Sequence, residues 1–380
     1  MRTLNAQPRR TVRRDGMALV LALGAIVVIG AVVAGGFYVA TRDVRTGRMT
    51  TAQERAQLRA EHALNLAREQ MESKKPQIAT DGGMLVYVTA GNAIVTRLNR
   101  DAYQISVALN EKANGGADRS NRRVSMLVVR RVPEMTFPGA LTVRGTTQIG
   151  GNTEIDGTDQ NPSGWDCPPA GDSKPGIVTP SLGDLKTSGG GCNNFDCVSG
   201  EPHVLPSADA AKDETYFQYG NMTWAELVTY ARKITPGTYT QIEPVLRADG
   251  SCNTTLDANW GDPIKGGAST ACESYYPMIY VPGNLKLTGN YGQGVLLVEG
   301  DLTVEGAFKF YGPVIVRGHL ATQGTGGHFN GGVMAANVDF ETNQALGDAT
   351  INYSSCAIAT ALTNSSPMLP VRQRSWAEMF

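Results

Sequence analysis

The chain has 380 residues, a net charge of −1 at pH 7 and only 18% charged residues. This charge balance excludes bulk electrostatic attraction to nucleic acid or to anionic lipid. With 44 glycines, the composition favours a mainly β, turn-rich protein over a helical one, and the length leaves room for two or three domains.

An uncharged apolar stretch spans residues 17–40 and is about as long as a helix that crosses a bilayer, roughly 20 residues. Five arginines precede it, and only Asp15 opposes their charge. Positive charge on a short N-terminal flank predicts that this flank stays in the cytoplasm. Everything after Arg42 is then expected outside the cytoplasmic membrane, held by a single transmembrane helix.

Secretory signal peptides and plain single-span anchors also contain an apolar stretch near the N-terminus. A signal peptide would have a shorter apolar region, followed by a cleavage site between small residues. Here the apolar residues instead run on into a polar, helical stretch. A plain single-span anchor has the same hydropathy, so that alternative stays open.

Residues 41–76 are expected to extend the helix beyond the membrane, and Pro76 ends it. Small residues recur there at three- and four-residue steps, which places them on one helical face. That face has two possible roles: close packing against neighbouring helices, or cover for the chain's own β-domain. The residues of this stripe are Ala52, Ala56, Ala60, Ala63, Ala67 and Met71.

The first fifth of the chain carries three short motifs: RDGMALV at 14–20, RM at 48–49 and AEHAL at 60–64. This segment resembles the N-terminus of type IV pilins and pseudopilins, and most closely that of PilX-type minor pilins. The resemblance implies a basic leader, residues 1–16, that is cleaved between Gly16 and Met17. It also implies pilin or pseudopilin subunits as partners of the N-terminal helix. Leu21 departs from the pattern, because major pilins carry a glutamate five residues into the mature protein.

Four short apolar runs with turn residues between them predict a small antiparallel β meander over 77–132. A long helix followed by such a meander is the order of elements in pilins. The meander is therefore a second feature in favour of the resemblance. The predicted strands are 84–88, 93–95, 103–107 and 124–129.

An apolar-x-Gly triplet repeats every six residues within 143–157 and returns within 281–324. A period this strict predicts a β-solenoid, in which three runs of six residues make a coil of about 18 residues. Glycine at the corners is expected to supply backbone conformations that other residues resist. We therefore assign 133–157 and 276–345 to a β-solenoid (β-helix).

Side chains alternate along a strand, so the solenoid predicts an apolar interior and a polar exterior. The residues expected inside are Val298, Val304, Phe310 and Val316, and those expected in solvent are Glu299, Glu305 and Arg317.

An offset of 18 residues stacks Glu299 against Arg317 and Asp301 against His319. Solenoid enzymes align acids and bases on one coil face, so this ladder is a candidate catalytic site. A charge pair on a solvated face is the commoner structure and contributes under about 1 kcal/mol. We favour the structural interpretation and expect no catalytic residue, no metal and no cofactor. His328 is expected in a loop.

Between the two solenoid parts, residues 158–275 are expected to form a loop-rich insertion with five of the six cysteines. An even number of cysteines outside the cytoplasm predicts disulfides, because long loops have few other means of holding together. Six cysteines allow 15 pairings, but close spacing favours Cys192 with Cys197 and Cys252 with Cys272. The remaining disulfide candidates are Cys167 and Cys356.

Two further expectations concern the insertion and the end of the chain. Thr223 and Glu226 form a capping box that predicts one helix in the insertion, and residues 346–380 are expected to be a tail. An acidic cluster offers oxygen ligands for calcium, although turn formation explains the same residues. The cluster is Glu154, Asp156, Asp159 and Asp166.

The sequence and the resemblance together predict a membrane-anchored, non-enzymatic pilin-like protein. Its role would be that of a minor component of a type IV pilus or related secretion filament, in assembly initiation, at the tip or in adhesion. The alternative is a membrane-tethered β-solenoid that binds or modifies carbohydrate without a filament role. The expected partners are pilin-like subunits, the membrane and a surface polysaccharide, but no nucleic acid.

Overall fold

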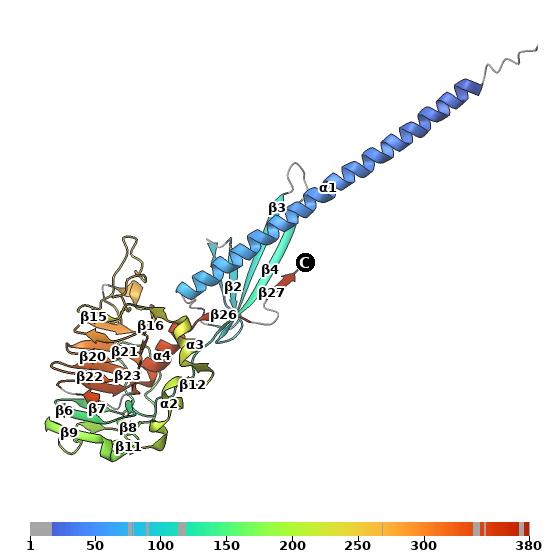
Figure 1. The fold of residues 1–380 in the computed structure, drawn as a ribbon. Coiled ribbons are helices and arrows are strands. Elements are labelled where there is room, and N and C mark those ends of the chain that lie inside the picture. Colours follow the sequence, from blue (N-terminus) through green and yellow to red (C-terminus); the bar gives the residue numbers. More distant parts are fainter. Residues whose placement is uncertain are drawn as a thin grey trace, which may run out of the picture. The chain divides into compact units, whose positions relative to one another are not determined.

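The computed structural model describes residues 17–379, apart from 75–77, 79, 89–90, 113–118, 268, 337–342, 346 and 372–375 (Figure 1). The basic leader, with Gly16, lies outside the described residues. The chain forms two compact units. The helix–sheet unit comprises residues 1–70, 78–128 and 370–380, and the parallel unit comprises 71–77 and 129–369. The protein is thus mostly β, with one long helix at its N-terminus.

Helix α1 runs without interruption over Met17–Lys74, which is 58 residues and about 87 Å at 1.5 Å per residue. The sequence contains no proline in this range, so nothing breaks the hydrogen-bond ladder. The stretch predicted to span the membrane and the predicted polar extension are therefore one continuous helix.

The helix–sheet unit also contains an antiparallel sheet with the strand order β1–β2–β3–β4. β1 pairs antiparallel with β2, and β2 with β3, as in the predicted meander. β27 comes from the stretch predicted to be a tail and pairs antiparallel with β4. The strands are β1 (Met84–Tyr87), β2 (Ala93–Arg97), β3 (Ala102–Lys112), β4 (Arg119–Arg130) and β27 (Trp376–Met379).

The parallel unit is built on two large sheets whose strand pairings are parallel. The first parallel sheet has twelve strands and the second has seven. The first contains β5 (Leu141–Val143), β7 (Glu154–Asp156), β8 (Ile177–Thr179), β10 (Val198–Ser199), β11 (Val204–Pro206), β14 (Arg232–Lys233), β16 (Met278–Val281), β18 (Tyr291–Gln293), β19 (Val295–Val298), β21 (Phe308–Val316), β23 (Gly327–Ala335) and β25 (Thr350–Tyr353). The second contains β6 (Thr147–Gly151), β9 (Leu185–Gly190), β15 (Gly237–Tyr239), β17 (Leu285–Leu287), β20 (Leu302–Val304), β22 (Leu320–Thr322) and β24 (Asn343–Ala345).

Between β19 and β23 the chain alternates between these sheets at nearly constant steps. Leu297 of β19 pairs with Ile315 of β21, 18 residues later, and Leu302 of β20 pairs with Leu320 of β22 at the same step. Strand β21 is long because it continues past a corner at Gly312. Successive passes of the chain therefore lie on one another, as Figure 1 shows.

The two stretches with the six-residue repeat lie next to one another in this stack, although about 120 residues separate them in the sequence. Strand β5 pairs with β23 on one side and with β8 on the other. Likewise, β6 lies between β24 and β9 in the second parallel sheet, and β7 lies between β25 and β10 in the first. The chain thus enters the stack in its middle.

The expectation of a loop-rich insertion over 158–275 needs correction. Strands β8, β9, β10 and β11 continue the stack beyond β5–β7, and β14 and β15 begin it at the opposite end, next to β16 and β17. These strands are two to six residues long and lack the six-residue period, so the sequence gives no sign of them. Parallel pairing with an existing strand edge satisfies their backbone groups.

The region also contains short helices and one hairpin. The capping box of Thr223 and Glu226 begins α3, as predicted, and a second helix lies a few residues before it. The elements are α2 (Asp213–Phe217), α3 (Trp224–Tyr230), the hairpin strands β12 (Gln218–Tyr219) and β13 (Met222–Thr223), and the 3₁₀ turns η2 (Leu182–Asp184), η3 (Ala208–Ala211) and η4 (Thr270–Cys272).

The predicted tail is also ordered structure. After β25 the chain forms α4 (Ser355–Ser365), which packs on β21 and β23, and then β26 (Met368–Pro370). The Ser354 hydroxyl accepts a hydrogen bond from the Ala357 amide and caps α4. The signal was present in the sequence, because a serine precedes an apolar run with helical spacing.

Glycine has two different roles in the stack. Gly312 and Gly331 pair in register at the corner and have φ angles of 131° and 151°, which side chains with a Cβ resist. Gly306 has no positive φ, but a Cβ there would lie 1.5 Å from the Thr288 carbonyl oxygen. The triplet glycine at 306 is therefore required by the close approach of the neighbouring pass, and not by the conformation that we expected.

The core of the stack lies in its interior, on the inward faces of the strands. The four residues expected inside, Val298, Val304, Phe310 and Val316, are all fully buried. The outer face of the first parallel sheet is buried as well, because the segment from η3 to α3 covers it with Tyr216, Tyr219 and Leu227. This cover places α3 against the predicted charge ladder.

Candidate functional site

The first half of α1 presents a continuous apolar surface. Every large apolar side chain from Leu19 to Val44 is more than half exposed. At about 1.5–3 kcal/mol for each such side chain, leaving fourteen of them in water would cost on the order of 20–40 kcal/mol. By length and composition this helix is able to cross a membrane. Its N-terminal half therefore requires either lipid or other protein around it.

The end of the apolar stretch has the character of a membrane interface. Phe37 and Tyr38 are followed by Arg42, whose guanidinium lies 6.0 Å from the centroid of the Tyr38 ring. Aromatic rings beside cationic side chains are enriched where a membrane helix meets the headgroups. The polar part of α1 begins at this point.

The second half of α1 uses its alanine stripe to cover the sheet of its own unit. Ala56, Ala60 and Ala67 are fully buried, as are Val95 and Ile105 of the sheet. A Cβ placed on Gly91, in the turn between β1 and β2, would lie 3.4 Å from the Ala63 Cβ. Of the two roles that the sequence left open for this stripe, the structure assigns it to the chain's own β-domain.

The structure forms both pairs of the predicted charge ladder. The Arg317 guanidinium donates to the Glu299 carboxylate. The Nδ1 of His319 lies 2.9 Å from an oxygen of Asp301, which also accepts from the His319 backbone amide at 2.9 Å. The 18-residue offset therefore identified the partners correctly.

The pair of Glu299 and Arg317 is partly exposed to solvent, and aromatic side chains of the covering segment pack against it. The indole N–H of Trp224 donates to Glu299 at 3.1 Å. The guanidinium carbon of Arg317 lies 4.8 Å from the Phe217 ring centroid and 5.8 Å from that of Trp224. Burial and, after it, the Glu299 charge raise the pKa of the neighbouring Tyr280.

This geometry supports structure more than catalysis. Both oxygens of Glu299 accept hydrogen bonds, and the Arg317 plane is stacked on rings. The arrangement holds the covering segment on the first parallel sheet. By contrast Glu305 pairs with Lys286 at 2.8 Å on the second parallel sheet, where no aromatic ring covers the pair among the described residues.

Asp159, one member of the acidic cluster considered for calcium, is engaged in hydrogen bonds of the chain itself. Asp159 accepts from the Ser355 amide and hydroxyl at 2.8 and 2.6 Å, and from the Gly171 amide at 2.6 Å. It thereby caps the N-terminus of α4. Within the part of the chain that the structure describes, no group of three His, Cys, Asp or Glu residues is arranged to hold a metal ion.

The six candidate cysteines form three disulfides. Cys192 pairs with Cys197 and Cys252 with Cys272, as their spacing suggested. The third bond joins Cys167 to Cys356 of α4 across 189 residues, a pairing that spacing gives no means to predict.

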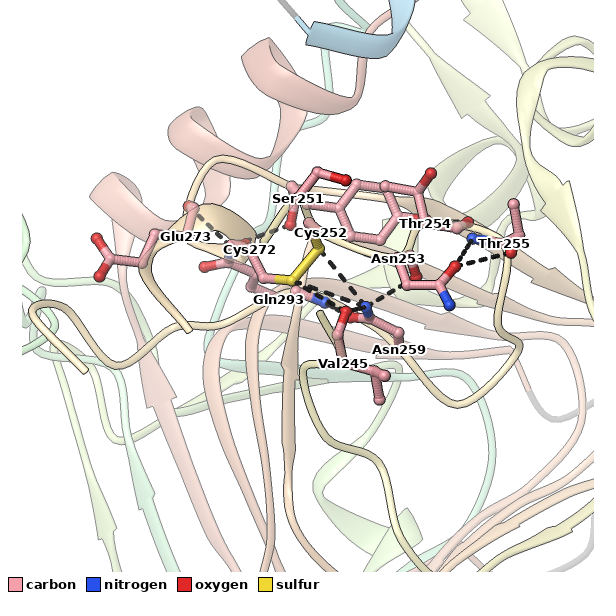
Figure 2. Close-up of a disulfide and its surroundings, with 12 residues drawn as sticks. Val245, Ser251, Cys252, Asn253, Thr254, Thr255, Asn259, Cys272, Glu273 and Gln293 are labelled. Atoms are coloured by element: carbon pink, nitrogen blue, oxygen red, sulfur yellow. Dashed lines mark hydrogen bonds between the residues drawn. A yellow bond between two sulfur atoms is a disulfide. The ribbon is translucent and has the colours of Figure 1, made fainter. Parts of the chain in front are cut away.

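Figure 2 shows how buried amides surround the disulfide of Cys252 and Cys272. The Asn259 side chain donates to the carbonyls of Val245 at 3.1 Å and Asn253 at 2.9 Å, and its nitrogen lies 3.5 Å from the Cys252 sulfur. The Gln293 amide, from β18, donates to the Glu273 and Tyr275 carbonyls at 3.0 Å each. The disulfide and these amides together hold the loop segment of residues 245–275 against the stack.

Several of these residues carry no signal in the sequence. In the sequence, Trp224 is only the first residue of a predicted helix, and nothing in a single sequence identifies it as the partner of Glu299. Asn259 is indistinguishable from the many turn-forming asparagines of this chain. His328 was expected in a loop but lies on β23, where burial and, after it, the Lys309 charge lower its pKa.

Neither a protein-family model nor a curated protein matches this chain. Among solved structures, the competence-associated pilin ComZ from Thermus thermophilus aligns with 87% of this chain and with 97% of its own length. The two chains are 10% identical and the TM-score is 0.21. A likeness of that size carries no argument about fold or function, so the proposals below depend on this chain's own residues.

Proposed function

We propose that this protein is a membrane-anchored, pilin-like subunit, a minor component of a type IV pilus or a related secretion filament. In that role it would initiate assembly or present an adhesive surface at the filament tip. The observation that carries the proposal is the division of α1. Its first half is apolar and exposed, and its second half is packed on an antiparallel sheet of the same unit.

This division gives the two halves of α1 separate tasks. The alanine stripe is already buried, so contacts with other subunits fall to the apolar half. Before assembly the bilayer would cover that half, and in a filament the same half of neighbouring subunits would cover it. Both environments remove the apolar side chains from water and thereby favour the structure.

The N-terminal motif supports the finer assignment to the PilX-type minor pilins. RDGMALV at 14–20 combines a basic leader, a glycine and the start of the apolar helix. In this proposal the leader is cytoplasmic and is cut after Gly16, which leaves Met17 as the mature N-terminus. The rest of the chain then lies outside the cytoplasmic membrane.

We further propose that the extracytoplasmic part is a non-enzymatic β-solenoid. The 18-residue steps, the parallel pairing and the buried apolar repeat residues support this architecture. The engagement of Glu299 and Asp159 in internal hydrogen bonds supports a structural or adhesive role over a catalytic one.

Mass spectrometry of the N-terminus of the membrane-extracted protein tests the proposal. We expect an N-methylated Met17 in the wild type and an uncut leader in a Gly16→Val variant. Gly24→Val is the matched control, because a Cβ at Gly24 meets no atom within 4 Å and processing should be unchanged. An intact Met1 in the wild type, or a cut after Ala40, contradicts the filament proposal.

A further inference from the structure

A cleft of about 660 Å³ lies on the outer face of the first parallel sheet. Its floor contains Thr142 of β5 and Val178 of β8, which pair in register. One wall is the extended chain before β5, with Glu134, and the other is the segment from Ser207 to Gly220. The volume is in the usual range for small-molecule sites, about 300–1,000 Å³.

The Thr142 side chain is exceptional in its position. It belongs to a row across the outer face of the sheet in which its neighbours, Ile315, Met334 and Val178, are apolar and buried. Thr142 is fully buried too, yet its hydroxyl has no hydrogen-bond partner among the described residues. An unpaired buried hydroxyl costs about 1–3 kcal/mol when no ligand or water bonds to it, so a valine would be the stabler choice in an empty cleft.

The walls of the cleft restrict the charge of a ligand. Glu134 and Glu214 are acidic and exposed, and Asp209 is paired with Lys212 at 2.5 Å. One cation against three carboxylates makes the cleft negative, which opposes anionic ligands. Carboxylates accept hydrogen bonds from hydroxyl donors, and the floor hydroxyl both donates and accepts.

We propose that this cleft binds a short neutral saccharide, whose hydroxyl groups bond to the Thr142 hydroxyl on the floor and to the Glu134 carboxylate on the wall. Saccharides supply donors and acceptors together, as the two groups require, and carry no negative charge. The inference does not depend on the filament proposal, because it concerns residues of the parallel unit alone.

Calorimetric titration of the full chain with maltotriose and with chitotriose tests this site. The protein is kept in a detergent without a sugar headgroup, and trigalacturonate serves as the anionic probe. We expect at least one neutral probe to bind, and trigalacturonate to bind at least tenfold more weakly. Thr142→Val should weaken the neutral probe at least tenfold while leaving thermal stability unchanged or higher.

Thr303→Val is the matched control, because Thr303 lies half-buried on the second parallel sheet and outside the cleft. It should bind as the wild type does. Glu134→Gln should weaken the neutral probe several-fold and reduce the discrimination against trigalacturonate. The proposal is overturned if neither neutral probe binds at millimolar concentration, if Thr142→Val binds as tightly as Thr303→Val, or if trigalacturonate binds best.

Discussion

The two parallel sheets share the same chain passes but differ in what covers them. All four residues of β19 in the first parallel sheet are buried, whereas β20 and β22 in the second have a half-buried residue between two buried ones. The segment from η3 to α3 covers the outer face of the first sheet. Nothing among the described residues gives the outer face of the second sheet a comparable cover.

The sequences of the strands reflect this difference in cover. β19 reads VLLV, an unbroken apolar run, and β20 reads LTV, which alternates. Strands that are buried on both faces become continuously apolar, and strands with one wet face alternate. The six-residue period locates the inward-facing residues of both sheets. Only the outward-facing residues that alternate with them along each strand tell which sheet is covered.

The largest expected effect comes from a charge placed inside the stack. Val298→Asp buries a carboxylate without a partner and should cost at least about 4 kcal/mol of unfolding free energy. Thr303→Asp, on the open face and in register with Lys286, should cost about 1 kcal/mol or less. Thermal melts and trypsin resistance of the detergent-solubilised chain measure both. Equal losses would mean that the inner and outer faces are not distinct.

Outer-face residues test the cover itself. Leu297→Ala removes apolar contacts beneath the covering segment and should cost about 2–5 kcal/mol. Thr303→Ala, its counterpart on the second sheet, should change stability by no more than about 0.5 kcal/mol. The same melts provide the measurement. If Leu297→Ala proved as mild as Thr303→Ala, the segment from η3 to α3 would not be packed on the sheet.

The interior of the stack and its cover also differ in how far the sequence predicts them. Periodicity identified Val298, Val304, Phe310 and Val316 as interior residues, and the long helix and the meander followed from their own patterns. The cover could not be predicted, because α2 and α3 are short and their partners lie about 60 to 120 residues away in the sequence. The same holds for β8 and β14, which are short and are defined by pairing with neighbouring passes.

Within the ladder, the sequence predicts the partners but not their surroundings. The 18-residue offset implies that Glu299 meets Arg317, since stacked passes align residues one coil apart. Whether such a pair is wet depends on Trp224, which enters from a different part of the chain. The pairing of Cys167 with Cys356 was beyond prediction for the same reason.

The two ion pairs provide a smaller test of the cover. The exposed fractions of the two pairs are similar, 34% for the side chains of Arg317 and Glu299 and 41% and 39% for those of Lys286 and Glu305. Any difference in stability between their variants must therefore come from the aromatic contacts. Arg317→Met loses the ring stacking and leaves Glu299 beside Trp224 without its cation, at a cost of about 1–2 kcal/mol. Lys286→Met should cost under about 0.5 kcal/mol. If the two variants lose equal stability, the aromatic enclosure contributes nothing.

The smallest expected effect concerns His328, which is half-buried on β23. Burial first, and then Lys309, lower the pKa of His328 below its ordinary 6.5, while Asp348 opposes them. The folded protein therefore favours the neutral imidazole, and the unfolded chain takes up the proton more readily. Stability should fall as the pH drops below about 6.5, and this contribution should level off once the folded protein is also protonated.

Denaturant titrations of variants between pH 8 and pH 5 isolate this contribution. His328→Gln should flatten the slope, and Lys309→Met should reduce it because the repelling charge is gone. If His328→Gln left the slope unchanged, the partial burial of His328 on β23 would be too weak to influence stability in this pH range.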